Sequence, residues 1–137
     1  MGVTPDAFSG NVAHLASLTV TYSDDAKGRL PTQLFLKVSK QDLHEEHLAL
    51  GRKEVEFYTS TMSRGLSIPV CYDAVCDPET GHSHILMDDL SPTHFQLTPP
   101  IPPSPEHCGM VVDSLALIHA YWWENPDLGV TIGQPFD

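Results

Sequence analysis

The run Leu34-Phe35-Leu36-Lys37-Val38 places a single lysine among apolar residues. Aromatic and β-branched residues favour a strand here, and alternation puts Phe35 and Lys37 on one face and Leu34, Leu36 and Val38 on the other. A buried ammonium is costly unless it has a carboxylate partner. The run therefore predicts a strand whose lysine either meets an acid or, on an edge strand, extends its ammonium to water.

A carboxylate in the next predicted element is the candidate partner. Residues 41–64 predict a helix, which the basic residue and glycine of Arg64-Gly65 end. At about 100° per residue, Glu54 falls within the apolar stripe that contains Val55. A helix that directly follows a strand packs back across the sheet, so Glu54 is expected near Lys37. Such a pair is either purely structural or the lysine–glutamate pair with which a kinase-type site orients nucleotide phosphates.

The remaining patterns predict more strands and one further helix. Residues 15–39 read as an antiparallel hairpin with a long loop, residues 68–75 and 84–87 read as a second strand pair, and residues 106–124 read as a helix that begins after Ser104. The expected fold class is α+β, with an antiparallel sheet and a packed helix, then a proline-rich linker and one long helix.

The prolines suggest where the chain divides. Residues 92–105 contain six of the twelve prolines, which is typical of a linker or an extended surface segment. The expected division is therefore residues 1–90, a linker over 91–104 and residues 105–137. The apolar face of the last helix, if nothing else covers it, is expected to self-associate or to dock on the chain's own sheet.

The composition disfavours some classes of binding partner. The formal net charge is −11, and a field of that sign disfavours nucleic acids and anionic membranes as general partners. No apolar run approaches the roughly 18 residues of a membrane-spanning helix. The three cysteines form no C-x-x-C motif, which predicts reduced thiols in a cytoplasmic protein. Cys71 and Cys76 are five residues apart, so on one strand they are expected on opposite faces.

Weaker signals mark other candidate positions. The turn at Gly10 could lay backbone N–H groups on phosphates, although it lacks Gly-x-Gly-x-x-Gly spacing and an ordinary turn is the simpler reading. The segment Met87-Asp88-Asp89-Leu90 follows a strand and could offer unpaired backbone groups to an adenine edge, or it could be an ordinary acidic turn. His82 and His84 could share a strand face and chelate a metal, although surface histidines are commoner and no metal site is predicted.

The ordered series of these motifs resembles a known family. It comprises Leu34-Phe35-Leu36-Lys37, the helix run Arg52-Lys53-Glu54-Val55-Glu56-Phe57-Tyr58, the strand end Ile85-Leu86-Met87-Asp88-Asp89-Leu90, and the histidine- and tryptophan-containing run over residues 115–123. The chain is similar along nearly its whole length to the aminoglycoside phosphotransferase and choline kinase-like superfamily, most closely its ecdysteroid-kinase-like branch.

The resemblance implies that residues 1–90 form a protein-kinase-like N-terminal lobe that binds ATP with Mg²⁺. It also implies that residues 105–137 hold the first helix of a truncated C-terminal lobe. Lys37 would contact the ATP phosphates, Glu54 would position Lys37, and Met87, Asp88, Asp89 and Leu90 would receive the adenine. The whole enzyme would transfer the γ-phosphoryl group of ATP to the hydroxyl of a small-molecule acceptor.

Two departures from the family pattern limit this expectation. The glycine-rich loop around Gly10 is poor, and the family's His-Gly-Asp type loop and its metal-binding aspartate would follow Asp137. The sequence therefore predicts a fragment that performs no phosphoryl transfer alone and whose Mg²⁺ ligands lie outside it. The alternative is a non-catalytic module that binds a nucleotide or another protein.

Overall fold

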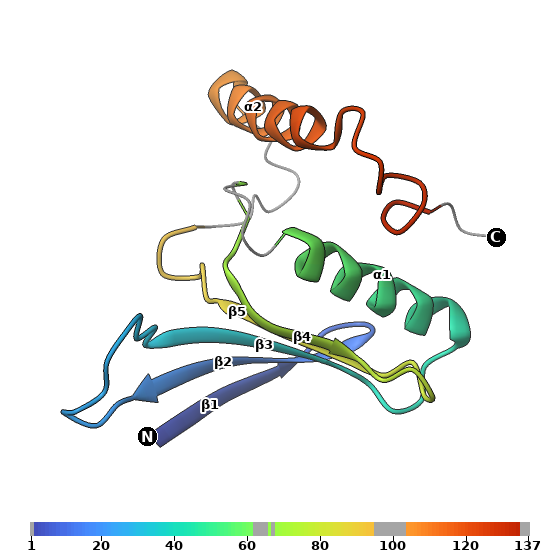
Figure 1. Ribbon diagram of the computed structural model, residues 1–137. Helices are drawn as coiled ribbons and strands as arrows, with labels where there is room; N and C mark the ends of the chain where they lie inside the picture. Colours follow the sequence, from blue (N-terminus) through green and yellow to red (C-terminus); the bar gives the residue numbers. More distant parts are fainter. Residues whose placement is uncertain (1, 62–65, 67, 95–103, 135–137) are drawn as a thin grey trace. The chain divides into compact units, whose positions relative to one another are not determined.

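A computed structural model describes residues 2–61, 66, 68–94 and 104–134. In chain order the elements are β1 (Gly2–Ser9), β2 (Ala13–Thr21), β3 (Gln33–Ser39), α1 (Glu45–Thr61), β4 (Cys71–Cys76), β5 (Ser83–Asp88) and α2 (Pro105–Trp122) (Figure 1). The chain divides into two compact units, Met1–Met62 with Pro69–Asp89 and Ser63–Ile68 with Leu90–Asp137. The α+β class is confirmed.

The first unit is built on one five-stranded sheet in the order β1-β2-β3-β5-β4, in which every neighbouring pair is antiparallel. The expected hairpin over residues 15–39 and the expected second strand pair are both present. The strand β1 was not expected, because Gly2, Pro5 and Asp6 are poor strand formers. Its place at the edge of the sheet explains why Pro5, which has no N–H to donate, is tolerated.

The helix α1 lies across one face of this sheet, over β4 and β5 (Figure 1). It begins at Glu45 rather than at residue 41, because the backbone carbonyl of His44 accepts its first hydrogen bonds, from the amides of His47 and Leu48. The predicted terminating pair Arg64-Gly65 lies outside the described residues. The helix and the strands beneath it enclose a core of Val55, Cys71, Ala74, Ile85 and Met87, flanked by Phe35, Tyr58 and Cys76.

A bulge in β4 overturns one expectation. The register of β4 against β5 shifts between Cys71 and Asp73. Because the extra residue inverts the alternation, Cys71 and Cys76 both face α1 instead of opposite sides of the sheet. All three cysteines are free, and burial raises the pKa of the Cys71 thiol, which keeps it protonated and weakly nucleophilic.

In the second unit, α2 begins as predicted. The side chain of Ser104 accepts a hydrogen bond from the amide of His107 at 3.2 Å, and Pro105 occupies the first helical position. Among the residues that the structure describes, neither helix combines the length and apolar character that a bilayer crossing requires. Most of the linker, residues 95–103, lies outside the described residues.

Much of the apolar surface of α2 is accessible to solvent, although Trp122 is buried. Self-association through this helix stays a prediction. The exposed apolar side chains at its C-terminal end and along its length are Met110, Val111, Val112, Leu115, Leu117 and Trp123.

Candidate functional site

Lys37 and Glu54 meet on the helix-covered face of the sheet. The ammonium nitrogen Nζ of Lys37, from β3, donates to Oε2 of Glu54, from α1, over 2.5 Å. Their side chains are 30% and 33% exposed, so the pair is partly shielded from water without being sealed off. The predicted contact is therefore present, whereas the catalytic roles expected of the two residues stay predictions.

The local sequence explains why these two side chains meet. Alternation in β3 directs Lys37 to the same side as Phe35, which packs on the core beneath α1. On α1, Val55 is buried and Glu54 lies at the margin of the packed face. Tyr58 lies one turn further along the helix. Its pKa is raised mainly by burial and, to a smaller extent, by the charge of Glu54. The carboxylate thus lies close enough to the core for its field to reach a half-buried phenol.

A cavity of about 370 Å³ lies next to the ion pair and is lined by both of its members. It lies between the first half of α1, the loop that precedes it and the adjoining ends of β2, β3 and β5. This volume is within the range of small-ligand pockets. Most of its wall is apolar and comes from Val12, Ala13, Leu43, Leu50, Gly51 and Ile85.

The polar wall of the cavity contains hydroxyl and imidazole groups as well as the ion pair. Ser39, His47 and Ser83 line it. The Oγ atom of Ser39 accepts from the amide of Ser83 at 2.9 Å and lies 3.1 Å from Nδ1 of His82. These bonds fasten the end of β3 to the beginning of β5, so the strand ends that border the cavity are held in register.

The arrangement can bind an anion through Lys37. An ammonium group has three N–H donors, and among the described residues Glu54 is its one hydrogen-bond partner. Two donors are therefore left for an oxygen-rich ligand, while the carboxylate fixes the direction of the lysine side chain. A lysine held in this way is a suitable phosphate contact.

Gly10 is the candidate phosphate contact in the turn between β1 and β2, and that role stays a prediction. Gly10 is not among the glycines with a positive φ. Its amide donates to the carbonyl of Ala13 at 2.9 Å, which closes the turn between β1 and β2. The simpler reading of Gly10 as an ordinary turn residue fits this geometry.

The expectation that residues 87–90 leave their backbone groups unpaired is wrong for two amides. The amide of Asp88 donates to the carbonyl of Val70 at 2.9 Å, and that of Asp89 donates to the carbonyl of Gln33 at 3.3 Å. Met87 is buried in the core, and Leu90 belongs to the second unit, where its carbonyl accepts from nearby amides. An adenine-binding role for this segment stays a prediction.

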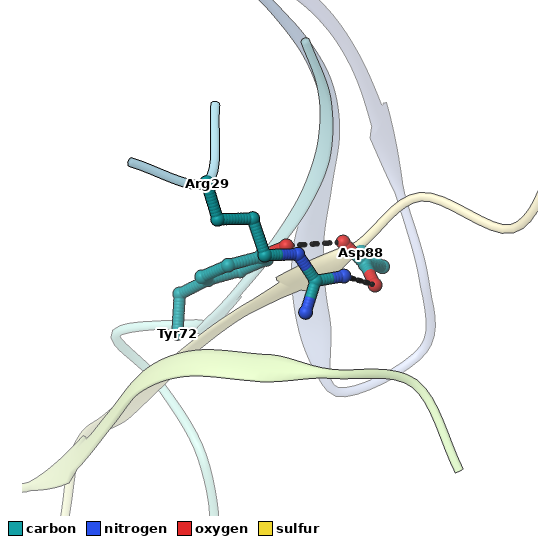
Figure 2. Close-up of polar contacts among 3 residues, drawn as sticks. All are labelled: Arg29, Tyr72 and Asp88. Atoms are coloured by element: carbon teal, nitrogen blue, oxygen red, sulfur yellow. Dashed lines mark hydrogen bonds and ion pairs between the residues drawn. The ribbon is translucent and has the colours of Figure 1, made fainter. Parts of the chain in front are cut away.

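The side chain of Asp88 takes part in a cluster that the sequence did not reveal. Figure 2 shows Arg29 and Tyr72 converging on its carboxylate, with Arg29 Nη2 3.1 Å from Oδ2 and Tyr72 Oη 2.5 Å from Oδ1. The guanidinium carbon of Arg29 lies 5.5 Å from the centroid of the Tyr72 ring, within cation–π range. This cluster attaches the β2–β3 loop to the end of β5.

The cluster predicts an unusual alkaline titration. Burial and the Asp88 carboxylate raise the pKa of Tyr72 from 10.0 to about 12, because both disfavour the phenolate. The stabilisation from the neutral phenol is therefore complete below pH 10 and is lost as the pH rises to about 12. The ultraviolet absorbance of tyrosinate in the parent, minus that of Tyr72→Phe, should titrate with a midpoint near 12. A midpoint near 10 would contradict the contact.

The two histidines of the second strand pair have different contacts, and His82 precedes β5. His84 lies 2.7 Å from the carboxylate of Asp73, on the side of the sheet away from α1, whereas His82 contacts Ser39 at the cavity. Among the described residues, no group of three or more His, Cys, Asp or Glu side chains could hold a metal ion.

The whole chain was also compared with known families, curated proteins and solved structures. No family model, no curated protein and no solved structure matches it.

Proposed function

We propose that the first unit binds the triphosphate of ATP and is the nucleotide-binding part of a small-molecule phosphotransferase. The whole enzyme would transfer the γ-phosphoryl group of ATP to a hydroxyl acceptor. The observation that carries this proposal is the 2.5 Å contact between Lys37 and Glu54 beside the cavity. An interaction module without a nucleotide is the alternative outcome of the test below.

The positions of the two residues in the fold support the proposal. In protein kinases the phosphate-binding lysine lies on the third strand and pairs with a glutamate from helix αC. Here Lys37 lies on β3, and Glu54 lies on α1, the helix that follows that strand. The resemblance seen in the sequence motifs and the contact in three dimensions thus select the same two residues.

Each residue would have a distinct role. Lys37 would donate its two remaining N–H groups to phosphate oxygens and offset part of their charge, and Glu54 would hold the ammonium in place. The cation Mg²⁺ would arrive as the Mg–ATP complex, as part of the substrate. A local cation is required because the chain as a whole has a net charge of −11, which repels a polyanion.

Titration of the chain with Mg–ATP, followed by calorimetry, tests the proposal. Lys37→Ala should weaken binding by about 10- to 100-fold, because a hydrogen bond to a charged group is worth roughly 1.5–3 kcal/mol. Lys27→Ala is the matched control, since it removes the same charge from an exposed loop residue and should leave the affinity unchanged.

Two results would contradict the proposal. Equal affinities of the parent and Lys37→Ala would show that the nucleotide does not reach the ion pair. Absence of binding by the parent at millimolar Mg–ATP would favour the interaction module.

A further inference from the structure

The glycine one turn before Glu54 is unusual for its position. Gly51 lies in the interior of α1, where glycine is less favourable than alanine because its backbone loses more freedom. It lies three residues before Glu54, so the two residues belong to neighbouring turns on one side of the helix. Such a glycine calls for a packing reason.

That reason is a close approach between α1 and β5. A Cβ atom at Gly51 would lie 2.7 Å from Oγ of Ser83, inside the contact distance of real side chains, while the Cβ of Ser83 would be 3.8 Å away. The helix backbone therefore lies against the first residue of β5, and a methyl group at Gly51 would fit only if the Ser83 hydroxyl rotated away. The conflict involves one atom, the Ser83 hydroxyl oxygen.

The strand cannot easily move aside. The amide of Ser83 donates to Oγ of Ser39, which also contacts His82, and Ser83 is paired with Cys76 on the other side. Further along α1, Val55 is buried in the core. A bulky side chain at Gly51 would therefore lift the first half of the helix while its second half stays packed.

We propose that Gly51 is a positioning residue, which sets the approach of α1 to β5 and thereby brings Glu54 within reach of Lys37. The contact between them, at 2.5 Å, is shorter than the usual range of about 2.7–3.2 Å, and lifting the helix by about two ångströms would lengthen it beyond hydrogen-bond distance. Its meaning for catalysis rests on the proposed function, whereas the contact itself does not.

The reactivity of the Lys37 amine provides a test that needs no nucleotide. Limited acetylation with an amine-selective reagent is read at each lysine by mass spectrometry, with the exposed Lys27 as the internal reference. The variant Glu54→Gln gives the acetylation rate of Lys37 without its carboxylate partner. Gly51→Val should raise the ratio of Lys37 to Lys27 acetylation about two- to five-fold, toward the ratio in Glu54→Gln. This is the factor expected for losing an ion pair that is about one-third exposed.

A rescue pair keeps the test valid if the valine variant does not fold. Gly51→Ala should raise the ratio by a smaller factor. Adding Ser83→Ala, which leaves only the 3.8 Å contact, should return it to the parent value. Amide hydrogen exchange in β3 and β5 identifies the folded variants. A parental ratio in folded Gly51→Val, or in Gly51→Ala where the valine variant is unfolded, overturns the proposal. Failure of Mg–ATP to bind would overturn the proposed function and leave this result untouched.

Discussion

Replacing Ile85 with alanine should lower the free energy of unfolding by about 3 kcal/mol, within the range of 2–5 kcal/mol for such core truncations. Ile85 is 2% exposed and is the largest fully buried side chain among the described residues. It faces α1 from the middle of β5, directly opposite Lys37 on β3 and Ala74 on β4. The neighbouring side chains on α1, β3 and β4 pack against one another, so they cannot move into the space that the truncation leaves.

Urea unfolding, followed by circular dichroism, measures this effect. Ile85→Val removes one methylene and should cost about 0.5–1.5 kcal/mol. Val75→Ala truncates a residue of β4 that is 47% exposed and should change the stability by less than about 0.5 kcal/mol. Equal losses for Ile85→Ala and Val75→Ala would show that the core does not lie beneath α1. A loss of the expected size is a large share of a typical stability of about 5–15 kcal/mol.

Gly81→Ala should lower the stability by about 2–3 kcal/mol, toward the upper end of the cost of a strained backbone position. Gly81 has a φ of +74° in the turn between β4 and β5, a conformation that costs other residues about 1–2 kcal/mol. A new Cβ would also lie 3.3 Å from the Cβ of Leu48 on α1, closer than ordinary contact. Strain and crowding therefore act together at this glycine.

Gly28→Ala is the matched comparison, measured by the same unfolding experiment. Gly28 also has a positive φ, of +98°, but it is exposed and a Cβ there would meet nothing within 4 Å. Its loop is free to relax, so the expected loss is about 1 kcal/mol. If Gly81→Ala cost no more than Gly28→Ala, the turn would not be pressed against the helix.

Local sequence patterns were sufficient to predict the features that depend only on residues close together in the chain. The alternation in Leu34–Val38 and the helical period around Glu54 each follow from bonding geometry within a few residues, and together they predicted the ion pair. The cap at Ser104 was predictable for the same reason.

The unexpected strand β1 and the wrong assignment of faces to Cys71 and Cys76 also have physical causes. The strand β1 is poor in strand formers and exists because β2 pairs with it over its whole length. The bulge beside Cys71 inserts one residue, and a single insertion reverses every later assignment of faces. Neither the pairing of β1 nor the bulge in β4 can be recognised from the hydrophobic periodicity of its own segment.

The sequence alone determined which residues carry the misplaced charges, because a lysine in a strand and an acid in an apolar helical stripe are both local anomalies. Only the tertiary structure decided that Gly51 lies against Ser83 and that Arg29 and Asp88, 59 residues apart, meet at Tyr72. Contacts of that kind depend on how closely whole elements approach, and this distance is set by the packing of many side chains at once.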